Sequence, residues 1–390
     1  MIKGIDQKKC TGCGICVRVC PLDTLRLNPF QQEVPPCQGA CPAGVDIRGY
    51  LFYLRQEMLW EAIRHLREFL PLPAITGRLC YHPCESGCAR KDVDEAVNIR
   101  GLERYVADLG LKESPPVLPL IHAAKAAVVG AGPAGLSAAY FLKRMGYGVT
   151  VFEASSEAGG MLKREVREGR LPETILKAQI RYLNDLGIEI RTQWPLGKRM
   201  SLEELDQERF RAIFLAPGFG HGGIARLPDA IVSPGEQGIS VDPVTLATRQ
   251  RGVFAGGGIT TERKPLVQVI ASARRAALSM DMFLQNKNMH ETLDPTVPKV
   301  TNLPGKGIKP LERQHPPQEK RSRAKRGSGE ETFGDEIALL EAQRCMSCGG
   351  KAYIAHPEDC MTCFECEVEC PSEAVSVHPF KEPLPMTIRI

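Results

Sequence analysis

The same cysteine spacing occurs near both ends of this chain of 390 residues. It reads C-x2-C-x2-C-x3-C-P at residues 10–21 and again at residues 360–371. Such a run is typical of bacterial 4Fe-4S sites, in which three thiolates bind one cluster and the fourth usually binds its neighbour. The predicted ligands are Cys10, Cys13, Cys16 and Cys20 in the first motif, and Cys360, Cys363, Cys366 and Cys370 in the second.

Each motif supplies only half of a two-cluster ferredoxin. One hypothesis is that the two ends meet in a single split α+β module. Cys370 would then complete the cluster of the first motif, and Cys20 would complete that of the second. The alternative is two independent modules with one cluster each.

A zinc site is a second alternative for part of the C-terminal segment. Cys345, Cys348, Cys360 and Cys363 form a CxxC-x11-CxxC pattern that resembles a zinc ribbon. That grouping would leave Cys366 and Cys370 unused in an otherwise complete cluster motif, so the sequence favours iron and sulfur.

A glycine-rich turn occupies the middle of the chain. Residues 126–153 contain an apolar strand, the glycines of a GxGxxG motif, a helix and a second strand that ends at Glu153. Gly130 suits the tight turn, Gly132 lets a pyrophosphate approach the backbone, and Gly135 allows the helix to pack closely on the strand. Glu153 follows at the distance where a carboxylate binds ribose hydroxyls. A Rossmann-like α/β domain that binds a dinucleotide is predicted.

Composition limits the other possibilities. The net charge of +4 is too balanced to indicate nucleic acid as a partner. No apolar run approaches the roughly 20 residues that cross a bilayer, and the N-terminus lacks the apolar region of a signal peptide. A cytoplasmic location is expected. In a reducing compartment the 15 cysteines are expected to bind metal or clusters rather than form disulfides.

From about residue 35 to residue 285 the chain resembles the FAD-binding part of the glutamate synthase small subunit family. That family includes the N-terminal part of dihydropyrimidine dehydrogenase and the NADPH-dependent ferredoxin oxidoreductases. The resemblance is carried by the glycine motif and by "PLPAITGRLCYHPCESGCAR", "EAGGML", "GRLP" and "GVFAGG". It implies bound FAD, contacted by Gly130, Gly132, Pro133, Ala134, Gly135, Glu153, Gly160, Arg170, Ala216, Gly256 and Gly257. Gly258 stands where the family usually has an aspartate, a departure at the position of the family's usual ribityl contact.

The chain also departs from this family by a deletion. Its members carry an NADPH-binding domain between two glycine turns, which here end the strand segments of residues 212–218 and 252–258. Here only residues 219–251 lie between those turns, enough for about one βαβ unit of roughly thirty residues. No second GxGxxG motif with strand and helix context occurs. We therefore expect no nicotinamide site in this chain.

Seven cysteines remain outside the terminal motifs. The resembled family has a helical domain that holds two 4Fe-4S clusters with cysteines and one Glu or Gln. The resemblance implies Cys41, Cys80, Cys84 and Glu103 for one cluster, and Cys37, Cys88, Cys345 and Cys348 for the other. The last two cysteines follow "IALLEAQR", which precedes a CxxC pair in the family but is found here near the C-terminus. The alternatives are a solvated Glu103 and a separate, redox-active surface CxxC.

These assignments use every cysteine and Glu103, which gives enough ligands for four clusters. The predicted organisation is a ferredoxin-like half (1–30), a helical iron-sulfur domain (31–115), an FAD-binding α/β domain (116–290), a linker (291–335), a CxxC segment (336–350) and a second ferredoxin-like half (351–390). The predicted function is that of an electron-transfer subunit that connects a partner oxidoreductase subunit to a one-electron carrier such as ferredoxin. A self-contained NAD(P)H:acceptor oxidoreductase and an iron-sulfur scaffold with a vestigial flavin site are the alternatives.

Overall fold

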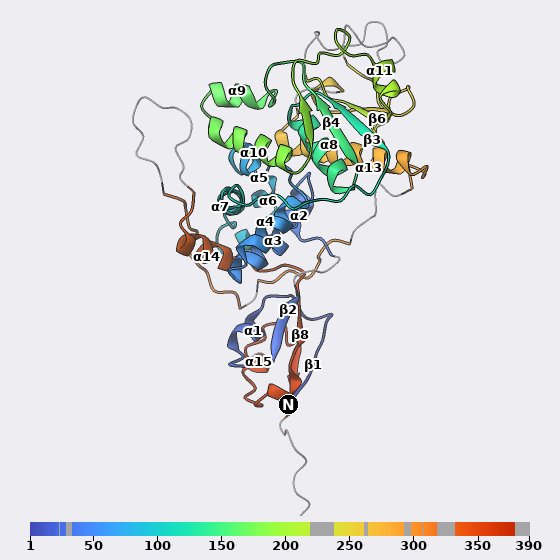
Figure 1. The fold of residues 1–390 in the computed structure, drawn as a ribbon. Coiled ribbons are helices and arrows are strands. Elements are labelled where there is room, and N and C mark those ends of the chain that lie inside the picture. Colours follow the sequence, from blue (N-terminus) through green and yellow to red (C-terminus); the bar gives the residue numbers. More distant parts are fainter. Residues whose placement is uncertain are drawn as a thin grey trace, which may run out of the picture.

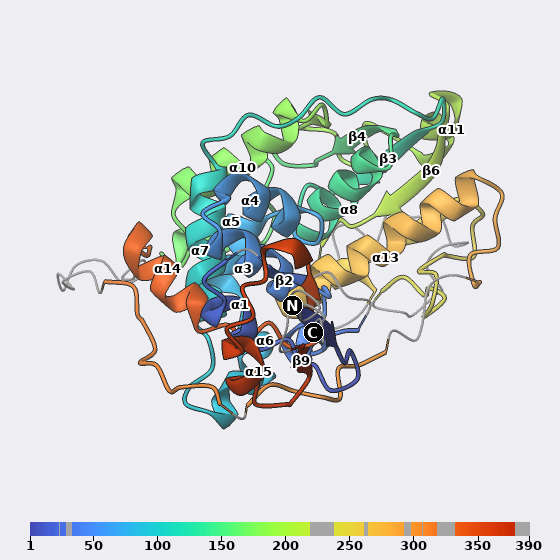
Figure 2. The same ribbon diagram turned by 90° about the horizontal axis from the view of Figure 1, so that it is seen from below.

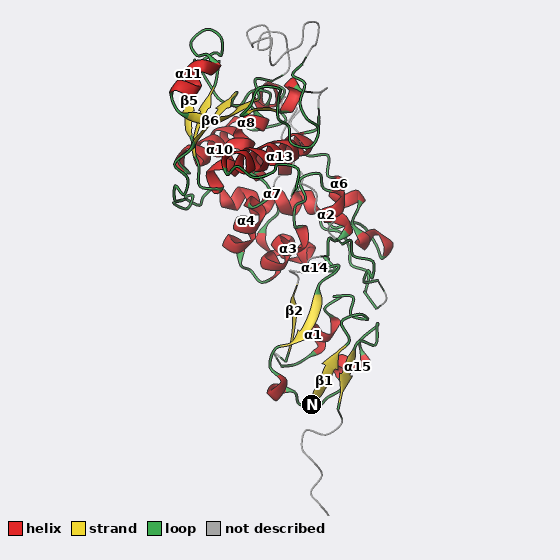
Figure 3. Ribbon diagram, turned by 90° about the vertical axis from the view of Figure 1, so that its right-hand side faces the viewer, coloured by secondary structure: helices red, strands yellow, loops and turns green. Residues whose placement is uncertain are grey.

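The computed structural model describes residues 1–22, 24–28, 33–218, 238–260, 264–291, 298–305, 307–317 and 332–378. They form three regions that follow one another along the molecule (Figure 1): a sheet domain, a helical region and a small α+β region. Figure 3 shows that strands occur at the two ends of the molecule, with helices between them.

The small region contains both ends of the described chain. Its strands pair antiparallel, each N-terminal strand with a C-terminal one. Two short helices, one from each end, pack against each other beside the strands. The elements are β1 (Ile2–Ile5) with β9 (Val375–Val377), β2 (Leu25–Asn28) with β8 (Lys351–Ile354), α1 (Ile15–Val19), α15 (Glu365–Val368) and the 3-10 turn η3 (Pro357–Asp359). Their apolar side chains and cysteines form one small core.

The two cysteine loops follow the same backbone path. Gly12 and Gly14 have φ of 74° and 73°, and at the matching positions Thr362 and Phe364 have φ of 59° and 66°. Glycine adopts this left-handed conformation without steric cost. Gly12 is also needed for space, because a Cβ there would lie 2.0 Å from the carbonyl oxygen of Gly350. The first loop therefore packs directly against the chain that enters β8.

The helical region is built mostly from residues 36–110. Its core contains fully buried side chains such as Tyr50, Leu54 and Leu66. The elements are α2 (Pro36–Ala40), α3 (Ile47–Arg55), α4 (Leu59–Arg67), α5 (Pro73–Leu79), α6 (Pro83–Ser86), the 3-10 helix η1 (Ala89–Asp92) and α7 (Ile99–Gly110). One further helix, α14 (Asp335–Gln343), comes from the C-terminal part of the chain and packs on α3 and α7.

The sheet domain has a parallel sheet that, within the described residues, runs in the order β5-β4-β3-β6-β7. Its strands are β3 (Lys125–Val129), β4 (Gly148–Phe152), β5 (Glu189–Arg191), β6 (Phe210–Leu215) and β7 (Val253–Ala255). The helical elements are α8 (Pro133–Arg144), α9 (Leu162–Arg167), α10 (Glu173–Asp185), α11 (Leu202–Gln207), the 3-10 helix η2 (Gly257–Ile259) and α13 (Leu266–Leu284). Helix α13 runs alongside α8 (Figure 2). The predicted α/β class is confirmed.

The strand order reverses between β3 and β6, which lie side by side although β4 and β5 come between them in sequence. In open parallel sheets, ligands bind at the carboxyl ends of the strands beside such a switch point. The glycine turn follows β3 at this place. Of residues 219–251, where the family's extra domain is predicted to be missing, residues 219–237 lie outside the described residues.

The predicted linker is described in part. Residues 298–300 pair with Val34, whose N–H donates to Pro298 at 2.8 Å and whose carbonyl accepts from Val300 at 3.0 Å. Further along, Leu311 and Gln314 donate backbone N–H groups to Asp94 and Glu341. The described linker therefore binds the helical region. Among the described residues, no helix is long and apolar enough to span a membrane.

Candidate functional site

Four cysteines from both ends of the chain lie together in the small region. Burial, followed by the neighbouring Cys13, Cys10 and Cys370, raises the pKa of the Cys16 thiol to about 12. Backbone N–H groups already point at two of these sulfurs, from Ala352 to Cys10 at 3.5 Å and from Ala374 to Cys370 at 3.3 Å. This group is the predicted first set of cluster ligands with Cys370 in the fourth place.

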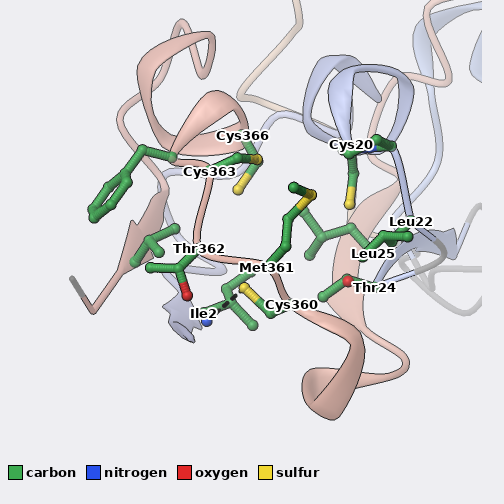
Figure 4. Close-up of a pocket in the computed structure, with 13 residues that line it drawn as sticks. Ile2, Cys20, Leu22, Thr24, Leu25, Cys360, Met361, Thr362, Cys363 and Cys366 are labelled. Atoms are coloured by element: carbon green, nitrogen blue, oxygen red, sulfur yellow. Dashed lines mark hydrogen bonds between the residues drawn. The ribbon is translucent and has the colours of Figure 1, made fainter. Parts of the chain in front are cut away.

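The second group surrounds a pocket in the same region (Figure 4). Cys20, Cys360, Cys363 and Cys366 line it, and Cys20 faces the others across the pocket. Burial raises the pKa of Cys366 to about 11, with Cys20, Cys363 and Cys360 as its charged neighbours. The Ile2 N–H donates to the Cys360 sulfur at 3.1 Å. Each terminal motif thus has its fourth cysteine beside the other motif.

The third group lies between α5, α6 and α7. Burial, with smaller contributions from Glu103 and Cys41, raises the pKa of Cys80 to about 11. The pKa of Cys84 is raised by burial and then by Glu103, Cys41, Glu85 and Cys80. Burial also raises the pKa of Glu103 to about 7, and its Oε1 accepts a hydrogen bond from Thr76 Oγ1 at 2.5 Å. Glu103 therefore lies on the face of α7 that looks toward these cysteines.

The fourth group joins the C-terminal CxxC pair to the helical region. Burial raises the pKa of Cys37 well above its usual value, and the next largest contributions to this rise come from Cys345, Cys88 and Cys348. Burial raises the pKa of Cys348 to about 12, with Cys345 and Cys88 next. Cys345 and Cys348 therefore lie with Cys37 and Cys88, whereas Cys360 and Cys363 belong to the second group. The zinc ribbon, which needs these two CxxC pairs together, does not match this arrangement.

Within the described residues, the four groups differ from the arrangement that holds a single metal ion. Among the described residues, no three His, Cys, Asp or Glu side chains are arranged to hold a single metal ion. Most of the thiols named above have raised pKa values because they are buried near one another. Metal binding removes thiol protons and neutralises the thiolates, so buried sulfur groups of this kind are suited to iron.

Sequence reasoning missed two arginines beside the fourth group. Arg55 donates from Nη1 to the Cys345 carbonyl at 3.2 Å and from Nη2 to Ser347 Oγ at 2.6 Å. Arg48 donates from Nη1 to the Cys348 carbonyl at 3.0 Å. The pattern of α3 gave no signal for this, because the contacts depend on the C-terminal segment lying against that helix.

A buried ionic network, also not predicted, holds that segment in place. Glu341 and Arg344 are 0% and 1% exposed and pair at 2.8 Å. Arg344 also binds Asp94 at 2.7 Å and donates to the carbonyls of Glu95, Ala96 and Leu311. The Glu341 carboxylate accepts the backbone N–H groups of Asn98 and Gln314, each at 2.7 Å. Since Cys345 follows Arg344, we call Asp94, Glu341 and Arg344 the clasp of the CxxC segment.

The glycine turn forms a narrow cradle at the end of β3. Gly130 has φ of 101°, and a Cβ there would lie 2.2 Å from the Ala216 carbonyl oxygen. A Cβ on Gly135 would lie 1.8 Å from the carbonyl oxygen of Gly130, so the helix packs tightly on the turn. Gly160 and Gly257 approach the turn from two other loops. A Cβ on Gly160 would lie 2.8 Å from the Cα of Gly132, and a Cβ on Gly257 would lie 2.9 Å from the Cβ of Ala134. Such a cradle at a helix N-terminus fits a pyrophosphate.

Glu153 closes one side of this cradle. Its Oε2 accepts the N–H of Ala131 at 2.7 Å, and its Oε1 accepts from the backbone and side chain of Ser155. The carboxylate is thus held beside the turn, where a ribose would meet it. Among the other predicted contacts, Pro133 begins α8, and Gly256 follows β7 against the Phe214 ring. Arg170 is exposed and pairs with Glu165 and Glu168.

Three protein families match parts of the chain. Residues 30–114 match the dihydropyrimidine dehydrogenase domain II, 4Fe-4S cluster. The predicted family resemblance is confirmed. Residues 4–26 match a 4Fe-4S binding domain, and residues 128–190 match an NAD(P)-binding Rossmann-like domain. The chain therefore carries iron-sulfur domains and a dinucleotide-binding Rossmann domain.

Several curated oxidoreductase subunits are similar over about half of the chain. The NADPH-Fe(3+) oxidoreductase subunit beta of Geobacter sulfurreducens is 41% identical over 47% of this chain and 28% of its own length. The NADP(+)-dependent formate dehydrogenase subunit beta of Moorella thermoacetica is 36% identical over 51% and 31%. The NAD-dependent dihydropyrimidine dehydrogenase subunit PreT of Escherichia coli is 34% identical over 48% and 46%. The chain thus spans less than half of each relative.

Proposed function

We propose that this protein is an electron-transfer subunit that holds FAD and four 4Fe-4S clusters. The observation that carries the proposal is the sorting of fifteen cysteines and Glu103 into four groups of four. Clusters pass single electrons, and bound flavin exchanges between one-electron and two-electron chemistry. The chain's own residues supply the ligands, the N–H groups aimed at sulfur and the cradle for the dinucleotide.

The small region is proposed to be one split two-cluster ferredoxin module. The pairing of β1 with β9 and of β2 with β8 supports this, as do Cys370 beside the first motif and Cys20 beside the second. We retain the predicted division into residues 1–30, 31–115, 116–290, 291–335, 336–350 and 351–390. On this division the CxxC segment and the second ferredoxin-like half return to regions begun by the N-terminal part.

The proposed partners are another oxidoreductase subunit and a one-electron carrier such as ferredoxin. The similar proteins are named as subunits of enzymes that use NADPH, NADP(+) or NAD. Among the described residues, one glycine motif, that of Gly130, Gly132 and Gly135, lies between a strand and a helix. We therefore propose that the nicotinamide chemistry belongs to a partner subunit, and that this chain carries electrons onward.

Cofactor analysis of anaerobically purified protein tests the proposal. About sixteen iron atoms, as much sulfide and about one FAD per chain are expected from four cubane sites and one cradle. Zinc in place of iron, or about eight iron atoms, would contradict the ligand grouping. Release of far less than one FAD on acid denaturation would favour the scaffold with a vestigial flavin site.

Reduction by different donors separates the two enzyme hypotheses. Dithionite is expected to bleach the visible absorption of the anaerobic protein, whereas NADH or NADPH alone leaves it unchanged within minutes. Rapid bleaching by either nicotinamide would show that the chain is a self-contained NAD(P)H:acceptor oxidoreductase. Addition of a nicotinamide-oxidising flavoprotein serves as the positive control.

A further inference from the structure

The two halves of the small region carry opposite charges. The described residues 352–378 contain six carboxylates and no lysine or arginine: Glu358, Asp359, Glu365, Glu367, Glu369 and Glu373. All of these except Glu367 are exposed. In the N-terminal half, the described residues up to Asn28 carry five lysines and arginines against one aspartate. The carboxylates therefore belong to the segment that supplies three of the four cysteines of the second group, and the Met1 ammonium, which donates to Thr362 Oγ1 at 2.8 Å, is a positive charge beside them.

The exposed side chains around that cysteine group are largely apolar, and we call them its apolar cover. Cys363 is exposed. Met361 and Leu22 line the pocket of the second group and are also 59% and 42% exposed, and Figure 4 shows Met361 between Cys20 and the other cysteines. Val368 on the nearby helix α15 is 75% exposed. Large apolar side chains beside a buried site are typical of a contact surface.

We propose that the face around Cys363 is the docking surface for a one-electron carrier protein whose own docking face is basic around an apolar centre. The proposal rests on the proposed function, because it needs a cluster on Cys20, Cys360, Cys363 and Cys366. In the sequence, Asp359 lies two residues before Met361 and Glu365 two residues after Cys363, so exposed carboxylates flank this stretch of the chain on both sides. Opposite charge steers the encounter, and the apolar contact excludes water.

A second copy of the chain does not fit this face in a symmetric contact. In such a dimer the same patch meets itself, so the exposed carboxylates of both copies would lie opposite one another. Like charges brought together across an interface cost free energy. The charge distribution therefore selects a basic partner over self-association through this face.

The test uses the full, cofactor-loaded chain and its variant Asp359→Lys/Glu365→Lys. Neither native side chain makes a hydrogen bond or an ion pair with another described residue. The control is Glu203→Lys/Asp206→Lys, which makes the same charge change on exposed positions of α11, at the other end of the molecule (Figure 1). Each protein is reduced with dithionite, freed of excess reductant and mixed by stopped flow with cytochrome c, a basic one-electron acceptor.

The electron balance is simple, because one electron leaves the reduced chain and reduces one ferric haem to ferrous. At low ionic strength the docking variant is expected to react about tenfold or more slowly than wild type, while the control keeps the wild-type rate. The difference shrinks at high salt, where exposed charges are screened. Hexaammineruthenium(III) and ferricyanide, a cation and an anion that each accept one electron, should respond in opposite directions.

Equal rates for wild type and the docking variant at low salt would overturn the proposal, as would the same loss in the control. A change in oligomeric state of the docking variant, measured by sedimentation, would show that a second copy occupies the face. Iron content and the low-temperature EPR spectrum of the reduced proteins separate this proposal from the proposed function. If wild type lacks clusters, the function fails; if all three proteins hold them and react alike, only the docking surface fails.

Discussion

Glu103 is an oxygen ligand proposed for a site otherwise made of sulfur. It lies beside Cys41, Cys80 and Cys84, and Thr76 donates a hydrogen bond to it. Burial raises the pKa of this carboxyl to about 7, so without a bound cation the carboxyl is only partly ionised near neutral pH. A bound cluster would supply the positive iron that such a carboxylate lacks. The residue is therefore better explained as a ligand than as a solvated position on α7.

Replacement of Glu103 tests this assignment. Glu103→Ala is expected to lose about four iron atoms per chain, because three cysteines alone leave one corner of a cubane open. Glu103→Gln keeps an oxygen ligand and retains most of the iron, with a shifted EPR signal. The matched control is Glu85→Gln, a carboxylate near Cys84 that instead binds Arg313 and the N–H of Arg100. Full iron content in Glu103→Ala would show that this carboxylate is not a ligand.

Arg55 places a positive charge beside the fourth cysteine group. Its guanidinium binds the Cys345 carbonyl and Ser347 and forms no ion pair with a carboxylate among the described residues. The reduction potential of a cluster depends on nearby charge and on hydrogen bonding around its sulfurs. Arg55 is thus placed to make a cluster bound by this group easier to reduce.

Arg55→Gln is expected to lower the potential of that cluster by an amount on the order of tens of millivolts, since a nearby cation is lost. Arg55→Lys retains the charge and should stay near the wild-type value. EPR-monitored redox titration measures the potential, and iron analysis establishes that all clusters are present. If Gln and Lys variants shift equally, hydrogen bonding or packing, rather than charge, explains the role of Arg55.

At the scale of elements, α14 is held on the helical region by the clasp. The apolar contact that α14 makes with the helical region is small, because the buried Ala338 and Ala342 have short side chains and Leu340 is half exposed. The ionic network therefore determines the position of the end of α14 and of Cys345, which follows it. Asp94 shares in it, and hydrogen bonds from Arg90, Leu311 and Glu95 keep the pKa of Asp94 well below its usual range despite burial.

Arg344→Met is expected to destabilise the protein by about 3–5 kcal/mol, because it leaves the Glu341 carboxylate buried without its partner. The cluster on Cys37, Cys88, Cys345 and Cys348 should be lost first. Anaerobic denaturant unfolding followed by circular dichroism measures stability, and iron analysis measures the cluster. Arg164→Met removes a surface pair with Glu168 and should cost little stability, because solvent screens that pair. A similar small loss for Arg344→Met would refute the clasp.

The features that could be predicted from sequence are those that depend on residues at short, fixed spacing. The glycine turn requires Gly130 and Gly135 at fixed positions, and each cysteine loop requires its own short run, so both were readable. The return of Cys345 and Cys348 was found only through family resemblance. The clasp, Arg48 and Arg55 were missed because their roles depend on which distant segment packs against each helix. Arg170, predicted at the flavin, pairs with Glu165 and Glu168 on the surface of the described structure.

At the scale of the whole molecule, the segment from α14 to β9 serves three of the four cysteine groups. It contributes Cys345 and Cys348 to the fourth group, Cys370 to the first, and Cys360, Cys363 and Cys366 to the second. It also supplies β8 and β9, the partners of β2 and β1. Only the group of Cys41, Cys80, Cys84 and Glu103 is complete without it. The N-terminal motif is therefore expected to depend on residues more than 300 positions away in sequence.

A chain that ends after residue 334 tests this dependence. We expect it to keep about one FAD and about four of sixteen iron atoms, because three sites lose at least one ligand. Independent terminal modules would instead keep the cluster of Cys10, Cys13, Cys16 and Cys20, and hence about eight iron atoms.

Single substitutions provide a milder test. Cys370→Ser keeps the rest of the chain and should alter the EPR signal of the N-terminal cluster, and Cys20→Ser should alter the signal of the C-terminal cluster. If each substitution changes only the cluster of its own motif, the two ends do not share ligands. Retained FAD in the truncated chain shows that the iron loss reflects missing ligands and not a collapsed fold.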